Sequence, residues 1–154
     1  METKKNKIGA LLVVEDNKGD QTILKEAFLA LGIANEIVVV DNGKEALTYL
    51  KGDEVQPILI LCDINMPVLD GLQLREEIFN DKKLRMKSIP FIFMSSDGSE
   101  ENIEKAFEYS VQGYFEKAKD FHSAVELLNI IINYWKASKL PHNKFGLLKE
   151  NARR

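Results

Sequence analysis

Five short apolar runs, separated by segments with helical spacing, are the feature that most limits how this chain can fold. The runs cover residues 8–14, 36–40, 58–62, 90–95 and 112–116. The first, third and fourth are almost continuously apolar, which is typical of strands in a parallel sheet with both faces covered. We therefore expect five strands in one parallel sheet.

The segments between the runs place apolar residues at helical intervals. In residues 20–31 one face carries Ile23, Leu24, Ala27, Phe28 and Leu31, with Gly32 as a stop. Asp20 and Ser99 are the expected caps of the first and fourth helices. Further helices are expected over residues 43–50, 70–79, 99–109 and 120–137. This alternation predicts an α/β fold, a doubly wound parallel sheet with helices on both faces and right-handed crossovers.

Length and composition limit the classes of protein to consider. The 154 residues fit one domain, and 45% apolar residues can fill its core. A net charge of -3 argues against nucleic acid as the main partner. Cys62 is the only cysteine, so an internal disulfide is excluded. No apolar stretch reaches the ~20 residues that span a bilayer, and the short first run argues against a secretory signal. We therefore expect a cytoplasmic protein without membrane contact.

The ends of four expected strands carry the residue types that chemistry would use. Glu15 and Asp16 follow the first, Asp63 follows the third, Ser95 ends the fourth and Lys117 follows the fifth. In an open parallel sheet the carboxyl ends of the strands form the site. The sequence therefore predicts three carboxylates, a hydroxyl and an ammonium at one edge of the sheet.

This set of groups predicts phosphoryl chemistry. Three carboxylates close together repel one another, and a divalent cation relieves the repulsion. Hard oxygen ligands suit Mg²⁺, which also neutralises charge on a transferring phosphoryl group. Asp63 can then act as a nucleophile and form an acyl phosphate. Lys117 and Ser95 would bind the phosphoryl oxygens.

Four segments, VVEDN, LILCDINMP followed by LDG, FIFMSSD and GYFEK, resemble the signature stretches of the receiver domain of response regulators in two-component signalling. They stand in family order and span roughly residues 8–137. The resemblance implies a flavodoxin-like fold of five β/α units with strand order 2-1-3-4-5. It also implies a receiver domain over residues 1–137 and a tail over 138–154 that is irregular or packed on the domain.

The resemblance carries over to single residues. Asp63 matches the phosphoacceptor, Glu15 and Asp16 the acidic pair, and Asn65 the residue whose backbone carbonyl binds the metal. The remaining matches are the switch hydroxyl, the switch aromatic and the basic residue, at Ser95, Tyr114 and Lys117. The family has a proline in a cis peptide after this lysine, whereas this chain has Ala118. A non-proline cis bond costs roughly 2.5–4 kcal/mol, which favours trans unless the fold enforces cis.

The resemblance implies a single-domain response regulator and not an enzyme, beyond self-catalysed phosphorylation and dephosphorylation. A sensor histidine kinase or a histidine phosphotransfer protein would phosphorylate Asp63, and the output would be a protein contact. The long connection over residues 80–89 and the tail are similar to stand-alone receivers that partner sensor kinases such as phytochromes. The last helix has a broad apolar stripe, so a homodimer through residues 99–109, 112–116 and 120–137 is one expectation. The alternative is that the tail covers this stripe.

Three other functions remain open on the sequence alone. A phosphohydrolase with an aspartate nucleophile would want a second acid two residues later, where Asn65 stands, and would turn over phosphate esters. A flavodoxin-type binder would not place Glu15 and Asp16 in its phosphate loop, and a colourless protein would argue against a flavin. A pseudo-receiver scaffold that needs no phosphorylation is disfavoured by the intact acidic set, but Ala118 leaves it open.

Overall fold

Five parallel strands form one sheet in the order β2-β1-β3-β4-β5, which confirms the fold class predicted from the sequence and the strand order implied by the family resemblance. The structure is a computed structural model, and it describes residues 8–53 and 56–141. The strands are β1 (Leu11–Val14), β2 (Ile37–Val40), β3 (Leu59–Cys62), β4 (Phe91–Ser95) and β5 (Gly113–Glu116). All pairs are parallel, so the carboxyl ends of the strands meet at one edge.

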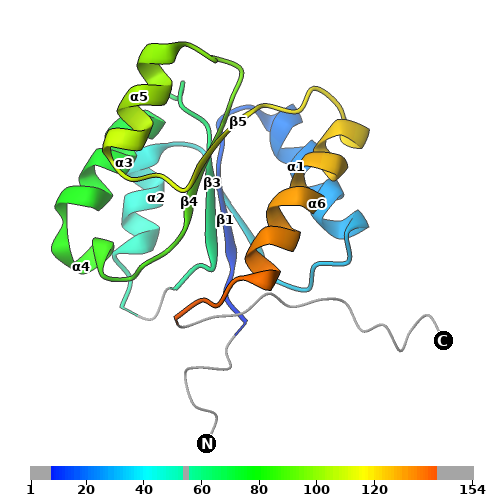
Figure 1. Ribbon diagram of the computed structural model, residues 1–154, viewed down its shortest axis with the longest axis horizontal. Coiled ribbons are helices and arrows are strands. Elements are labelled where there is room, and N and C mark those ends of the chain that lie inside the picture. The colour runs from blue at the N-terminus through cyan, green and yellow to red at the C-terminus, as the bar shows by residue number, and fades with distance from the viewer. Residues whose placement is uncertain (1–7, 54–55, 142–154) are drawn as a thin grey trace, which may run out of the picture.

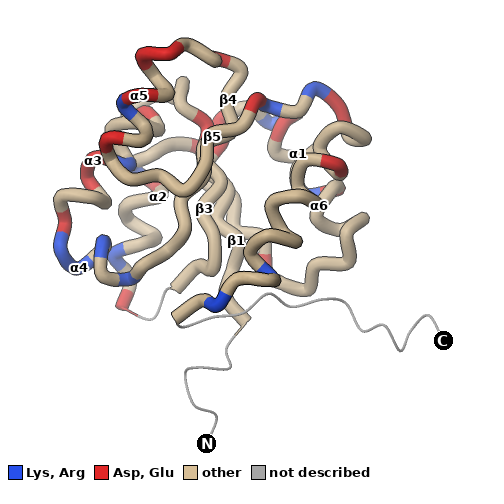
Figure 2. Tube along the Cα trace, in the orientation of Figure 1, with Lys and Arg blue, Asp and Glu red and all other residues tan. Residues whose placement is uncertain are grey.

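Helices cover both faces of the sheet (Figure 1). One face carries α1 (Lys18–Ala30) and α6 (Phe121–Ala137), which pack against each other. The other carries α2 (Gly43–Leu50), α3 (Gly71–Asn80), the one-turn α4 (Lys82–Arg85) and α5 (Glu100–Glu108). Figure 2 shows basic positions gathered around α4, away from the edge where the strands end.

The apolar core is divided into two halves by the alternation of side chains along the central strands. On β1, Leu12 and Val14 face the half that includes α2 and α3, and Leu11 and Val13 face the half that includes α1 and α6. All four are at most 1% exposed. Burying such side chains stabilises the fold by roughly 1.5–3 kcal/mol each. This is why the central strands read as continuous apolar runs.

Two local expectations are corrected and two are confirmed. Asn17, and not Asp20, caps α1, because the Asn17 side chain accepts from the backbone N–H of Asp20 at 2.9 Å. The connection over residues 80–89 contains α4, a helix too short to show apolar periodicity. Ser99 caps α5 as expected, and Gly32 ends the first helical segment at a φ of 71°. The shift of the first cap places Asp20 inside α1.

The described part of the expected tail begins where α6 ends. Leu140 packs against the core half that contains α1 and α6. The rest of the tail, residues 142–154, lies outside the described residues, so the domain boundary at residue 137 stays a prediction. Within residues 8–53 and 56–141, the structure contains no helix with the length and apolar character to cross a membrane.

Arg75 ties α3 to the end of α5. It is 7% exposed, and its Nε and Nη2 donate to the carbonyl oxygens of Tyr109 and Ser110 at 2.6 and 3.2 Å. Its guanidinium lies 5.4 Å from the centre of the Phe91 ring. Burial lowers the pKa of Arg75 to about 10, so it is charged at neutral pH. One buried cation therefore binds two carbonyls directly after the end of α5, where a positive charge is favourable.

Arg75→Met is expected to lower the free energy of unfolding by about 2–3 kcal/mol, because the carbonyls of Tyr109 and Ser110 lose a charged donor that is itself buried. Urea unfolding followed by circular dichroism measures the loss. The matched control is Arg85→Met, since Arg85 also donates to a carbonyl, that of Phe79, but is exposed. Equal stability losses in the two variants would contradict this role of Arg75.

Candidate functional site

The loop after β1 supplies two acidic side chains to the carboxyl edge of the sheet. The backbone N–H of Glu15 donates to the carbonyl of Val40 at 3.0 Å, and the Glu15 side chain is only 3% exposed. Its Oε2 accepts from the backbone N–H of Asn17 at 3.1 Å. Asp16 is exposed. The loop therefore offers one buried and one exposed carboxylate.

Asp63 follows β3 at the same edge, and its side chain is 10% exposed. Its backbone N–H donates to the carbonyl of Val14 at 2.9 Å, which holds it beside the end of β1. Its Oδ1 accepts from the backbone N–H of Ile64 at 2.8 Å. One carboxylate oxygen is thus held by the main chain, and Oδ2 is the atom that contacts a basic side chain.

The carboxylates of Glu15, Asp16 and Asp63 form one cluster, with an oxygen of each within 4.8 Å of the others. Burial, with a smaller contribution from the charge of Asp63, raises the pKa of Glu15 to about 7 against the opposing effect of Lys117. Crowded carboxylates are costly to ionise, and oxygen ligands at this spacing suit a hard cation. The cluster therefore fits a divalent metal ion.

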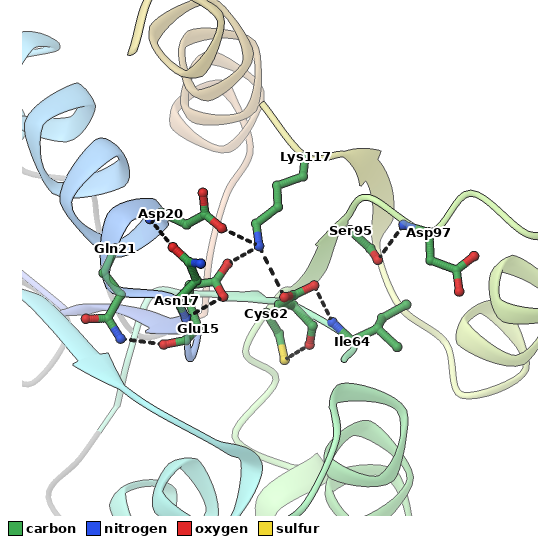
Figure 3. A network of polar contacts seen from close by, with 10 residues as sticks. Glu15, Asn17, Asp20, Gln21, Cys62, Ile64, Ser95, Asp97 and Lys117 are labelled. Carbon is green, nitrogen blue, oxygen red and sulfur yellow. Dashed lines mark hydrogen bonds and ion pairs between the residues drawn. The ribbon is translucent and has the colours of Figure 1, made fainter. Parts of the chain in front are cut away.

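Lys117 follows β5 and places its ammonium among three carboxylates (Figure 3). Its Nζ lies 2.5 Å from Glu15 Oε1, 2.8 Å from Asp20 Oδ2 and 3.2 Å from Asp63 Oδ2. Burial alone would lower the pKa of Lys117, but the bonds to Asp20 and Glu15 outweigh it and raise the pKa. The ammonium is therefore charged at neutral pH and contacts the predicted nucleophile directly.

The bond between Lys117 and Ala118 is trans, as are the other peptide bonds among the described residues. The backbone N–H of Lys117 donates to the carbonyl of Ser95 at 3.0 Å, so the chain keeps its place beside β4 as β5 ends. The side chain of Ala118 packs against the core half that contains α1 and α6. The departure from the family pattern therefore coexists with a lysine that reaches the acidic cluster.

Ser95 and Tyr114, the two predicted switch residues, both bind the backbone of Asp97. The Ser95 hydroxyl is buried at the end of β4 and accepts from the Asp97 N–H at 3.0 Å. The Tyr114 hydroxyl donates to the Asp97 carbonyl, and its ring lies 6.0 Å from that of Phe93. The loop after β4 thus links the two residues, while their role as a switch stays a prediction.

Asn65 is exposed two residues after Asp63, in the loop between β3 and α3. Its predicted role as a metal ligand through the backbone carbonyl stays a prediction. Glu15, Asp63 and Lys117 meet directly, and Asp16 joins the two acids in the cluster. The sequence thus located the edge where these side chains meet.

Asp20 is the site residue that sequence reasoning missed. It was expected to cap α1, but it occupies the first turn and its carboxylate binds Lys117. Figure 3 shows Asp20 and Lys117 directed toward each other from α1 and from the segment after β5. Asn17 is also a good cap by residue type, but the sequence does not fix where α1 begins, so it gave no clear sign that Asp20 is left to bind Lys117.

Comparisons with known proteins agree with this geometry. The response regulator receiver domain family matches residues 11–129. The response regulator Rcp1 of Synechocystis is 26% identical over 140 residues, which cover 88% of this chain and 94% of Rcp1.

Two crystal structures are similar throughout their length. The phosphorylated cyanobacterial phytochrome response regulator RcpA is 30% identical, with a TM-score of 0.80, and the match covers 88% of this chain and 99% of RcpA. The Mn²⁺-bound form of Rcp1 is 26% identical with a TM-score of 0.77, and the match covers 86% and 99% of the two chains. The likeness therefore includes relatives solved with a phosphoryl group and with a divalent metal.

Proposed function

Because the chain belongs to the response regulator receiver domain family, we propose that Asp63 accepts a phosphoryl group in a reaction that depends on Mg²⁺. The donor would be a phosphohistidine of a sensor histidine kinase or of a histidine phosphotransfer protein. The observation that carries the proposal is the convergence of three carboxylates with Lys117 bound to Asp63. The likeness to RcpA favours a phytochrome-type kinase as the donor.

Each residue of the site has a role in the proposed transfer. A carboxylate oxygen of Asp63 forms a bond to phosphorus while the bond from phosphorus to the donor histidine nitrogen breaks. Lys117, 3.2 Å from Asp63 Oδ2, and the Ser95 hydroxyl would bind the phosphoryl oxygens. Asp16, Asp63 and the carbonyl of Asn65 would hold the metal, with Glu15 reaching it through water. Bound Mg²⁺ would neutralise charge on the transferring group.

Incubation with acetyl phosphate and Mg²⁺ tests the proposal without knowledge of the natural kinase. Intact mass spectrometry should show the gain of one phosphoryl group, and a chelator should prevent it. A chain that takes up no phosphoryl group from any donor would be a scaffold that works without phosphorylation. Sustained hydrolysis of a generic phosphate ester would instead indicate a phosphohydrolase.

The affinity for Mg²⁺ is expected to fall by about ten-fold from pH ~8 to pH ~6. The metal-free pKa of Glu15 is about 7, so below that pH a proton occupies the carboxylate and must leave when the metal binds. Above that pH the Glu15 carboxylate is ionised, so no proton competes with the metal. Isothermal titration calorimetry at both pH values measures the change and the proton release.

Glu15→Gln is the matched variant, because it keeps the shape of the side chain and removes its titration. Its affinity should depend less on pH over the same interval. Equal affinities of the unmodified chain at both pH values would contradict the role given to Glu15.

The output of the phosphorylated form is proposed to be a protein contact in the cytoplasm, with neither nucleic acid nor membrane as the partner. A surface of α5, β5 and α6 is the proposed location, either for a target or for a homodimer. It includes three large apolar side chains that are at least half exposed, namely Phe107, Ile130 and Tyr134. Ser95 and Tyr114 would connect this surface to Asp63 through Asp97.

A further inference from the structure

The Lys117 ammonium has one partner that lies outside the acidic cluster of Glu15, Asp16 and Asp63. Glu15 and Asp63 belong to that cluster, whereas Asp20 comes from the first turn of α1. The Asp20 carboxylate lies 2.8 Å from Lys117 Nζ, closer than Asp63 at 3.2 Å. The three carboxylates together match the three N–H donors of an ammonium group.

We propose that Asp20 is a positioning residue that holds the Lys117 ammonium beside Asp63 during phosphorylation. The inference rests on the proposed function. Glu15 and Asp63 would be engaged by the metal and by the phosphoryl group, so Asp20 is the partner that keeps its bond to Lys117 throughout. Asp20, which has no other role in the proposed reaction, thereby determines the position of the Lys117 ammonium.

The local structure of Asp20 suits this role. Its backbone N–H is held by the side chain of Asn17 at 2.9 Å, in a helix that packs against α6. Its own side chain is 29% exposed, so an ionised carboxylate there costs less than at Glu15. Lys117, by contrast, has a long side chain that loses rotamer freedom when it is fixed. An acid on a rigid helix is what holds such a side chain in one position.

A simpler role for Asp20 is to stabilise α1, since an acidic residue in the first turn favours the helix. That role predicts a small change in stability and no change at Lys117. The two roles are therefore separated by observing the ammonium group itself, in the full chain and without metal or phosphoryl donor.

The first experiment follows the ¹⁵N signal of the Lys117 ammonium by NMR, identified by its absence in Lys117→Arg. An ammonium held in ion pairs exchanges its protons slowly and should give an observable signal. We expect the signal to shift or broaden in Asp20→Asn and to be largely retained in Asp20→Glu. Glu26→Gln is the control, because Glu26 is an exposed acid on the same helix. An unchanged Lys117 signal in Asp20→Asn would overturn the proposal.

The second experiment measures the phosphorylation rate with acetyl phosphate beside the affinity for Mg²⁺. Asp20→Asn should slow phosphorylation by about ten-fold, because a misplaced charge stabilises the transfer less well. Its Mg²⁺ affinity should change far less than that of Asp16→Asn. An Mg²⁺ affinity reduced as strongly as in Asp16→Asn would place Asp20 among the metal ligands and overturn the positioning role.

The two experiments keep this inference separate from the function on which it rests. If the unmodified chain takes up no phosphoryl group, the proposed function fails, and the NMR signal still decides whether Asp20 positions Lys117. If the unmodified chain is phosphorylated and Asp20→Asn reacts at the same rate, the positioning role fails alone.

Discussion

Replacing Gly71 by alanine is expected to lower the free energy of unfolding by at least about 3 kcal/mol and to reduce phosphorylation of Asp63. A Cβ at Gly71 would lie 2.1 Å from the backbone oxygen of Asp63 and 2.8 Å from the Phe93 ring. The Asp63 oxygen belongs to the main chain at the end of a central strand, so α3 would have to move. The backbone N–H of Gly71, which donates to the carbonyl oxygen of Ile64 at 2.8 Å, would move with the helix.

Gly98→Ala is the control for this prediction. A Cβ there meets no atom within 4 Å, so its stability should be close to that of the unmodified chain. Chemical denaturation of both variants measures the difference, and the acetyl phosphate reaction measures the effect on Asp63. Wild-type stability of Gly71→Ala would show that α3 does not need to approach Asp63 so closely.

Lys117→Met is expected to destabilise the metal-free chain by about 2–4 kcal/mol at pH ~8, since breaking a buried ion pair leaves an uncompensated charge. The side chains of Glu15 and Asp63 are 3% and 10% exposed, and both would lose their cation. The loss should be smaller at pH ~6, because the raised pKa of Glu15 lets it take up a proton and become neutral. Saturating Mg²⁺ should also narrow the difference, because a bound cation would offset the same charges.

Lys18→Met is the control, because it shows how much stability is lost when an ion-paired lysine on the surface is replaced. Lys18 is also ion-paired, at 2.8 Å from Asp41, but its side chain is 75% exposed and such pairs contribute little. Thermal or urea unfolding at both pH values, with and without Mg²⁺, gives the comparison. A Lys117→Met variant as stable as Lys18→Met in metal-free buffer at the higher pH would contradict the electrostatic account of the site.

The fold could be predicted from the sequence because its strongest signal is the alternation of apolar runs with segments of helical periodicity. The buried central strands read as continuous apolar runs, and alternation with helices leaves few topologies for a parallel sheet. The same rule located the site, since residues such as Asp63 and Lys117 directly follow strands whose ends must meet. The strand order came from the family resemblance and is confirmed.

Features that leave no periodic pattern and no distinctive residue type in the sequence could not be predicted in this way. Asp20 and Asn17 are both good caps by residue type. Only the start of α1 decides that Asn17 caps the helix and that the Asp20 carboxylate is left to bind Lys117. The four residues of α4 are too few to show a helical period. The link through Asp97 uses backbone atoms, so the identity of its side chain gives no sign of it.

The most direct test compares the unmodified chain with Asp63→Asn after exposure to acetyl phosphate and Mg²⁺, by intact mass. The substitution keeps the size of the side chain and removes the nucleophilic carboxylate. We predict that the unmodified chain gains one phosphoryl group and that Asp63→Asn gains none. Equal phosphorylation of the two chains would contradict the assignment of Asp63 as the phosphoryl acceptor.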